Sequence, residues 1–299
     1  MPSWVNSCIR VLVRRFMPGI AAALEEENQF DRIEGPAHDL TDPALYLQVE
    51  DNRAETTIVA FAGMAVLYAA MPRFEFKKML QETGGHYNYV FVRDVFRSSY
   101  RRAPDGSGNG IAFYRRIVGE ALQRLGAKEN IAIGMSGGGE AAFRISGGAP
   151  IHRIIALNPA FPMERYGSWS NLFHALLSLN KLVREPGVYM ETLLVVLSLF
   201  YLWRHNKKLL GREPLQLPLQ DYLQRAAPAV LVYSAQCRPD AQQALALKDI
   251  PSIVLYPVES KRHNCLADMK KRGVEQPFLR EALRGNGSSA PEGLSSVPE

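Results

Sequence analysis

The sequence contains little cysteine and lacks the histidine pattern of metalloproteases. Its 299 residues include three cysteines, Cys8, Cys237 and Cys265, an odd number without the spacing of metal ligands. A disulfide framework is therefore not expected, and a reducing compartment, the cytoplasm, is the default prediction. The six histidines form no H-E-x-x-H pattern, so we predict no catalytic metal and no other cofactor.

Unbroken apolar stretches are absent from the N-terminal part. Residues 1–24 contain no acidic residue, and Arg10, Arg14 and Arg15 interrupt the apolar positions there. A secretory signal needs a continuous apolar stretch, so none is predicted. We expect instead an amphipathic helix that stops near Pro18 and packs on the protein itself, with contact to an anionic membrane surface as the alternative.

An excess of charge of one sign is missing as well. The formal net charge is +5 and the isoelectric point is near 9.1, which permits an anionic substrate or membrane surface but requires neither. We expect no nucleic-acid partner. With 47% apolar and 22% charged residues, the composition is that of an ordinary globular protein, long enough for one large domain with an insertion.

Short apolar strands alternate with helices along most of the chain. We predict strands at 44–49, 57–61, 87–92, 131–133, 153–158, 229–234 and 252–256, and helices at 71–81, 111–125, 241–247 and 276–283. This alternation predicts an α/β fold, a mostly parallel central sheet with helices on both faces. Catalytic groups in such sheets lie beyond the carboxyl ends of the strands, where this chain places Gly63, Asp94, Ser136, Asn158 and Phe161.

The alternation stops once, which divides the chain. We predict an N-terminal lead-in with the amphipathic helix (1–43), the first part of the core (44–161), a helical cap or lid insertion (162–227), the second part of the core (228–284) and a disordered tail rich in Gly, Ser and Pro (285–299). Within the cap, residues 192–203 are almost entirely apolar but too few to cross a membrane. We interpret them as a lid helix over an apolar pocket; a buried core helix and an interfacial anchor are the alternatives.

The most informative motif follows the strand at 131–133. Ser136 is flanked by Gly134 and Gly138, and helix-favouring residues come directly afterwards. This is the G-x-S-x-G pattern of a nucleophile elbow, in which the serine occupies a sharp turn that larger neighbours would obstruct. The hydroxyl would then face a cleft at a helix N-terminus, where the amide of Gly137 could stabilise an oxyanion.

Three other interpretations compete with the elbow. A phosphate loop would need Lys followed by Ser or Thr where Glu140 and Ala141 stand. A dinucleotide turn would need an acidic residue at the end of the next strand, which instead ends at Asn158. The third alternative is a tight turn without chemistry, and an acid and a histidine in suitable places decide against it.

Both residue types follow in later loops. Asp240 comes after the predicted strand at 229–234, and His263 comes after the last predicted strand. Asp94, at an earlier strand end, and Glu259, on the loop of His263, are rival acids. Asp240 could also merely cap the next helix, since it follows a proline, and His263 could be a surface histidine.

The chain order Ser136, Asp240, His263 resembles that of the α/β-hydrolase fold superfamily, over residues 44–283. The resemblance implies that Ser136 is the nucleophile, that His263 transfers the proton, and that Asp240 orients the imidazole and stabilises its cation. The insertion at 162–227 falls where that fold usually accepts a cap.

The resemblance also implies an oxyanion hole, formed by the amides of Gly137 and Met64. The segment 61–64 lacks the His-Gly pair often found at that position, and the elbow is unusually rich in glycine, so the subfamily remains unassigned.

Substrate-binding residues are expected at the same edge of the sheet and in the cap: Gly63, Met135, Arg93, Phe161 and Trp203. Six arginines follow the strand at 87–92: Arg93, Arg97, Arg101, Arg102, Arg115 and Arg116. They could hold a phosphate or carboxylate group of the substrate, and the alternative is that they form a solvated basic face. We therefore expect a small-molecule acyl substrate, in one version attached to an anionic carrier.

The sequence predicts a serine hydrolase, an esterase or thioesterase that works through an acyl-enzyme. An acyltransferase with the same triad and a non-catalytic hydrolase-like binding protein are the alternatives. The sequence does not indicate an oligomeric state.

Overall fold

The structure of the protein is a computed structural model that covers most of the predicted core. It describes residues 8, 11–12, 14–15, 40–64, 74–159, 173, 176–177, 183–190, 193–194, 196–197 and 227–285. Every helix and strand named below lies within these ranges.

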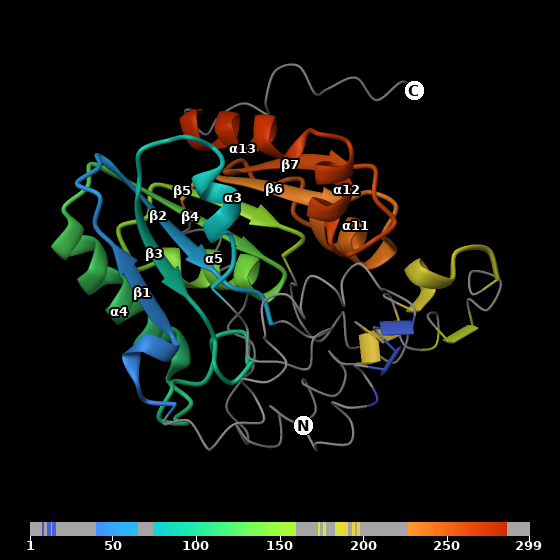
Figure 1. The fold of residues 1–299 in the computed structure, drawn as a ribbon, viewed down its shortest axis with the longest axis horizontal. Coiled ribbons are helices and arrows are strands. Elements are labelled where there is room, and N and C mark those ends of the chain that lie inside the picture. Colours follow the sequence, from blue (N-terminus) through green and yellow to red (C-terminus); the bar gives the residue numbers. More distant parts are fainter. Residues whose placement is uncertain are drawn as a thin grey trace.

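Seven strands of the described chain form one sheet in the order β1-β3-β2-β4-β5-β6-β7 (Figure 1). The strands are Leu47–Glu50 (β1), Thr56–Phe61 (β2), Asn88–Val92 (β3), Glu129–Met135 (β4), Arg153–Leu157 (β5), Ala229–Ser234 (β6) and Ile253–Val258 (β7). β1 runs antiparallel to β3, and the other pairs are parallel. The predicted mostly parallel sheet is thus confirmed.

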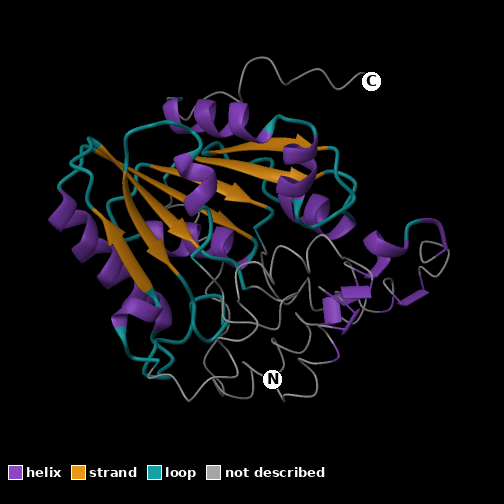
Figure 2. Cartoon of the chain, viewed as in Figure 1, coloured by secondary structure: helices purple, strands orange, loops and turns teal. Residues whose placement is uncertain are grey.

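Helices cover both faces of this sheet (Figure 2). One face carries α4 (Gly110–Leu125), α5 (Gly137–Ser146) and α11 (Arg238–Leu245), and the other carries α3 (Lys77–Gln81), α12 (Cys265–Lys271) and α13 (Glu275–Arg284). In β4, Ala132 packs toward α5 while Ile131 and Ile133 pack toward the opposite helices. Because both faces are covered, the central strands contain runs of consecutive apolar residues, such as Ile58–Phe61 and Ile131–Ile133, rather than alternating ones.

The register of the strands brings their carboxyl ends to one edge. Phe61 of β2 pairs with Gly134 of β4, and Leu157 of β5 pairs with both Met135 of β4 and Val232 of β6. The loops that follow these strands therefore begin side by side, which is where polar side chains can converge in a parallel sheet.

Three predicted element boundaries were wrong. The helix expected from residue 71 begins at Lys77, because Phe76 adopts a left-handed conformation with φ of 71° that no helix can include. The strand expected from residue 44 begins at Leu47, after a 3-10 turn at Pro43–Leu45. Asp240 was expected in a loop but lies in the first turn of α11, since Pro239 starts that helix earlier.

The predicted N-terminal helix and cap lie only partly within the described residues. Those described between 8 and 15 are helical, and so are those between 173 and 197 other than Glu185. Almost all of the predicted tail is outside the described part. Among the residues that are described, none of the helices combines the length and hydropathy that a membrane span requires.

A buried ion cluster fixes α5 to the loop before α4. The Glu140 carboxylate in the first turn of α5 lies 2.7 Å from the guanidinium of Arg144 and 3.2 Å from that of Arg101. The Glu140 side chain is fully buried, and those of Arg144 and Arg101 are 4% and 8% exposed. Removing one member of such a cluster leaves the others charged in a place that water does not reach.

We predict that Glu140→Ala lowers the free energy of unfolding by about 3–5 kcal/mol, because two buried arginines lose their counter-charge. Glu120→Ala is the matched control: Glu120 also forms an i,i+4 pair with an arginine, Arg116, at 2.9 Å, but both side chains are 59% exposed. That control should cost about 0.5 kcal/mol or less. Urea denaturation of both variants measures the difference, and equal losses would contradict the account.

Candidate active site

Ser136 occupies the turn between β4 and α5 in a strained conformation. Its φ is 53° and its ψ is −120°, values that residues with a side chain rarely adopt. The turn is held by two backbone bonds: the Ser136 amide donates to the Leu157 carbonyl at 2.9 Å, and the Ser136 carbonyl accepts from the Glu140 amide at 3.1 Å. A tight turn without chemistry does not require a serine in this conformation, and such strain is typical of functional sites.

The glycines on either side allow α5 to approach the sheet closely. A Cβ atom on Gly134 would lie 2.3 Å from the Gly138 carbonyl oxygen, and one on Gly138 would lie 2.2 Å from the Phe61 carbonyl oxygen. Neither position can hold a larger residue without moving backbone. The spacing of the motif is therefore dictated by contact between the helix start and the ends of β2 and β4.

Asp240 and His263 are brought together by α11 and by the loop after β7. Asp240 Oδ1 lies 2.9 Å from His263 Nδ1, and the Asp240 residue is only 2% exposed. Burial raises the pKa of the Asp240 carboxyl, while His263 and a hydrogen bond from Asn158 lower it. An ionised Asp240 only accepts hydrogen bonds, so the proton of the neutral imidazole is on Nδ1, and Nε2 is left as the basic nitrogen.

The two rival acids have other partners. Asp94 is fully buried and accepts hydrogen bonds from the amides of Phe96 and Tyr100 at 3.0 and 2.8 Å, and from the amide and hydroxyl of Ser98. Burial raises the pKa of the Asp94 carboxyl, against the effect of these bonds. Glu259 pairs with Arg272 at 3.5 Å, and its side chain is 53% exposed.

The loop after β2, predicted to supply an oxyanion-hole amide, lies against the first residue of α5. A Cβ atom on Gly137 would lie 2.8 Å from Met64 Cγ, so the Met64 side chain packs directly on Gly137. The Gly63 amide donates to Glu75 Oε2 at 3.0 Å, and the Tyr100 hydroxyl donates to the Ala62 carbonyl at 2.9 Å.

These two anchoring residues, Glu75 and Tyr100, were not predicted from the sequence. No local signal could have shown them, because each reaches the loop from a different part of the chain.

The remaining predicted substrate-binding residues are placed as follows. Met135 ends β4 and precedes Ser136. A Cβ atom built on Gly63 would lie 3.1 Å from the Met135 carbonyl oxygen. The Arg93 guanidinium stacks on the Phe74 ring, 4.5 Å from its centroid, and Nε donates to the Leu45 carbonyl. Phe161 and Trp203 lie outside the described residues. The substrate-binding role of all five stays a prediction.

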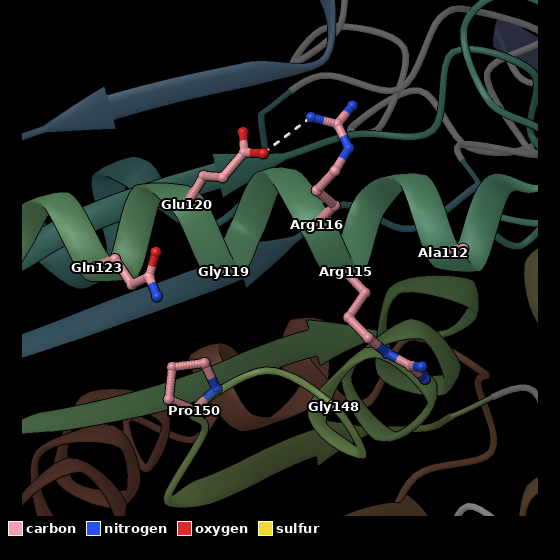
Figure 3. A pocket seen from close by; sticks show the side chains of 8 residues that line it. All are labelled: Ala112, Arg115, Arg116, Gly119, Glu120, Gln123, Gly148 and Pro150. Carbon is pink, nitrogen blue, oxygen red and sulfur yellow. Dashed lines mark hydrogen bonds and ion pairs between the residues drawn. The ribbon is translucent and has the colours of Figure 1, made fainter.

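Several of the other arginines bond to groups of the protein itself. Arg102 donates to the Gly106 carbonyl and stacks on Phe96, and Arg115 donates to the Arg144 carbonyl at 2.8 Å. Arg115 and Arg116 also line a groove of about 410 Å³ between α4 and the turn at Gly148 and Pro150 (Figure 3). The residues that line this groove do not include Ser136, Asp240 or His263.

Comparison with solved structures finds a shared fold at low sequence identity. No known family model matches the sequence, and no curated protein matches it. A crystal structure of a protein of unknown function from Staphylococcus aureus aligns with a TM-score of 0.53 at 10% identity, over 79% of this chain and 93% of that one. An esterase from Pyrococcus furiosus aligns at 0.49 and 13% identity, over 79% and 85%. MenH from S. aureus aligns at 0.48 and 11% identity, over 79% and 97%.

The fold is that of the α/β-hydrolases. The mostly parallel sheet, its antiparallel first strand and the serine elbow between β4 and α5 define it, as the sequence resemblance predicted. Because fold does not determine function, the chemistry has to be argued from the site.

We predict that Gly138→Ala destabilises the protein by about 1–3 kcal/mol or more, because the new methyl group overlaps the backbone of β2. Gly119→Ala is the control, since a Cβ atom on Gly119 in α4 meets no atom within 4 Å. That change should stabilise by about 0.5–1 kcal/mol through helix propensity. Thermal and urea unfolding compare the two, and a Gly138→Ala variant as stable as the parent would refute the close approach.

Proposed function

We propose that the protein is a serine hydrolase that cleaves an ester or thioester through an acyl-enzyme. The observation that carries the proposal is the pairing of Asp240 with His263 at the edge of the sheet where Ser136 occupies a strained elbow. A buried carboxylate on the Nδ1 side of an imidazole is the arrangement that prepares Nε2 to take a proton from a nucleophile.

Each residue then has a defined role in the first half of the reaction. Ser136 Oγ attacks the acyl carbonyl while His263 takes the hydroxyl proton. The imidazolium that forms is stabilised by Asp240, which stays ionised. The leaving alcohol or thiol receives that proton, and the acyl group remains on Ser136. In the second half, water attacks the acyl carbonyl and gives a proton to His263. The bond to Ser136 Oγ then breaks, this oxygen takes the proton back from His263, and the acid leaves.

The oxyanion that forms in both halves needs backbone donors. Gly137 is the first residue of α5, so its amide and the positive end of that ten-residue helix point to the same place. The second donor proposed is the Met64 amide. The neighbouring Gly63 amide already donates to Glu75, which supports Met64 rather than Gly63 in this role. Loss of one such donor typically lowers kcat about a hundredfold to a thousandfold.

We further propose that residues 162–227 cover the acyl chain as a cap. One contact supports a link between this segment and the catalytic edge: Lys261, two residues before His263, pairs with Glu185. A small-molecule acyl substrate enclosed by an apolar cap would bind mainly through its chain.

Ser136→Ala tests the proposal. We predict that a fluorophosphonate probe adds its mass to wild-type Ser136 and that the variant is not labelled. Hydrolysis of p-nitrophenyl esters and acyl-CoA of graded chain length should fall by about 10⁴-fold or more in the variant, as in other triads. Ser146→Ala, at the far end of the same helix, is the matched control and should retain labelling and activity.

The same assays separate the alternatives. A labelled enzyme that transfers its acyl group to an added alcohol or amine faster than to water would be an acyltransferase. Folded wild-type protein that neither reacts with the probe nor hydrolyses any of these substrates would contradict the hydrolase and favour a binding protein.

A further inference from the structure

We propose that Asn158 is a positioning residue for the acid–histidine pair, which it orients by holding Asp240 and the His263 loop at the same time. The inference rests on the proposed function, since it concerns the same pair. It follows from the bonds of one side-chain amide, Asn158 Nδ2, at the end of β5.

The Asn158 amide nitrogen bridges two elements. It donates to Asp240 Oδ2 at 3.0 Å and to Ser234 Oγ at 3.0 Å. Asn158 is 1% exposed, and its backbone amide donates to the Val232 carbonyl at 2.7 Å, so the residue is fixed against β6. With Oδ2 held by Asn158, the other oxygen of Asp240 is the one that bonds to the imidazole.

The directions of these bonds are determined by their partners. An ionised carboxylate only accepts, so the Asn158 NH₂ group, and not its oxygen, must face Asp240. The Ser234 hydroxyl donates its proton to the Arg262 carbonyl at 2.5 Å and therefore accepts from Asn158. Arg262 precedes His263, so Asn158 reaches the acid directly and the histidine loop through one hydroxyl.

The backbone explains why an asparagine serves here. Asn158 has a φ of 42°, in the left-handed region where asparagine, aspartate and glycine are the residues most readily accommodated. Of these three, glycine has no donor and aspartate would place a second negative charge beside Asp240. Only asparagine combines the backbone conformation with an NH₂ group.

The Asn158 bond has a chemical consequence besides orientation. In the active form the imidazole is neutral and Asp240 carries its full charge, so the hydrogen bond from Asn158 stabilises this form most. After His263 is protonated, the imidazolium partly neutralises the carboxylate and the bond contributes less. Removing the donor should therefore favour the protonated pair. In a plot of kcat/KM against pH, the fall in activity on the acid side (the acid limb) should then move to higher pH. The Cys265 thiol on α12, which is close enough to feel the charge of Asp240, stays neutral because burial raises its pKa.

Two variants test the proposal. Asn158→Gly removes the donor without a backbone penalty, and Asn158→Asp keeps the shape while adding a like charge. We predict that kcat falls about tenfold to a hundredfold in Asn158→Gly, with little change in KM, because the pair is misplaced rather than removed. Its acid limb should move to higher pH. Asn158→Asp should lose more activity, since the like charge raises the pKa of Asp240, and a protonated Asp240 stabilises the imidazolium less.

Asn130→Ala is the control for loss of a buried asparagine. Asn130 lies at the start of β4, at the opposite end of the sheet, where its side chain donates to the Pro150 carbonyl at 2.8 Å. The Asn130→Ala substitution should lower thermal stability and leave the pH dependence of kcat/KM unchanged. An Asn158→Gly enzyme with the wild-type acid limb would overturn the positioning role, whatever its stability.

A second readout separates this inference from the proposed function. The His263 imidazole can be titrated by NMR in wild type and Asn158→Gly, with its signal assigned by its loss in His263→Gln. A higher His263 pKa in Asn158→Gly supports the inference even if wild type hydrolyses no ester. An unchanged pKa overturns it even if the hydrolase activity is established by the Ser136 experiments.

Discussion

The contact between the first turn of α5 and the end of β2 is the constraint on which the rest of the site depends. Gly138 lies so near the Phe61 carbonyl that a single added carbon would overlap it. The same turn holds Ser136 at a positive φ and places Gly137 against the Met64 side chain. The strain of the turn is opposed by burial of α5, whose ten residues are all buried.

Buried and partly buried polar groups then hold the loops that surround the elbow. Asp94 accepts hydrogen bonds from amides of its own loop, and Glu140 joins that loop to α5 through Arg101. Tyr100 and Glu75 form hydrogen bonds with the segment after β2. Asn158 does the same for Asp240. Asp94 orders its own loop, and the other side chains join one segment to another, so connecting segments at this edge of the sheet are fixed by hydrogen bonds.

The sequence was sufficient to predict those features that depend on residues close together in the chain. The strand, the glycines and the helix around Ser136 are adjacent in the chain, and the order of Asp240 and His263 follows from the alternation of strands and helices. Asn158 was recognised only as a residue at a strand end, because its partner Asp240 is 82 positions away. The start of α3 was wrong for the same reason: the conformation of Phe76 accompanies a contact between Glu75 and Gly63 that no helical pattern encodes.

The central claim is that the hydroxyl of Ser136 and the imidazole of His263 act as one unit. A crystal structure of the protein after reaction with a fluorophosphonate tests it most directly. The account predicts a phosphonate bonded to Ser136 Oγ, with His263 Nε2 within about 3.2 Å of that oxygen or of the leaving-group position. An adduct on another residue, or an imidazole out of reach of Ser136 while still bonded to Asp240, would contradict it.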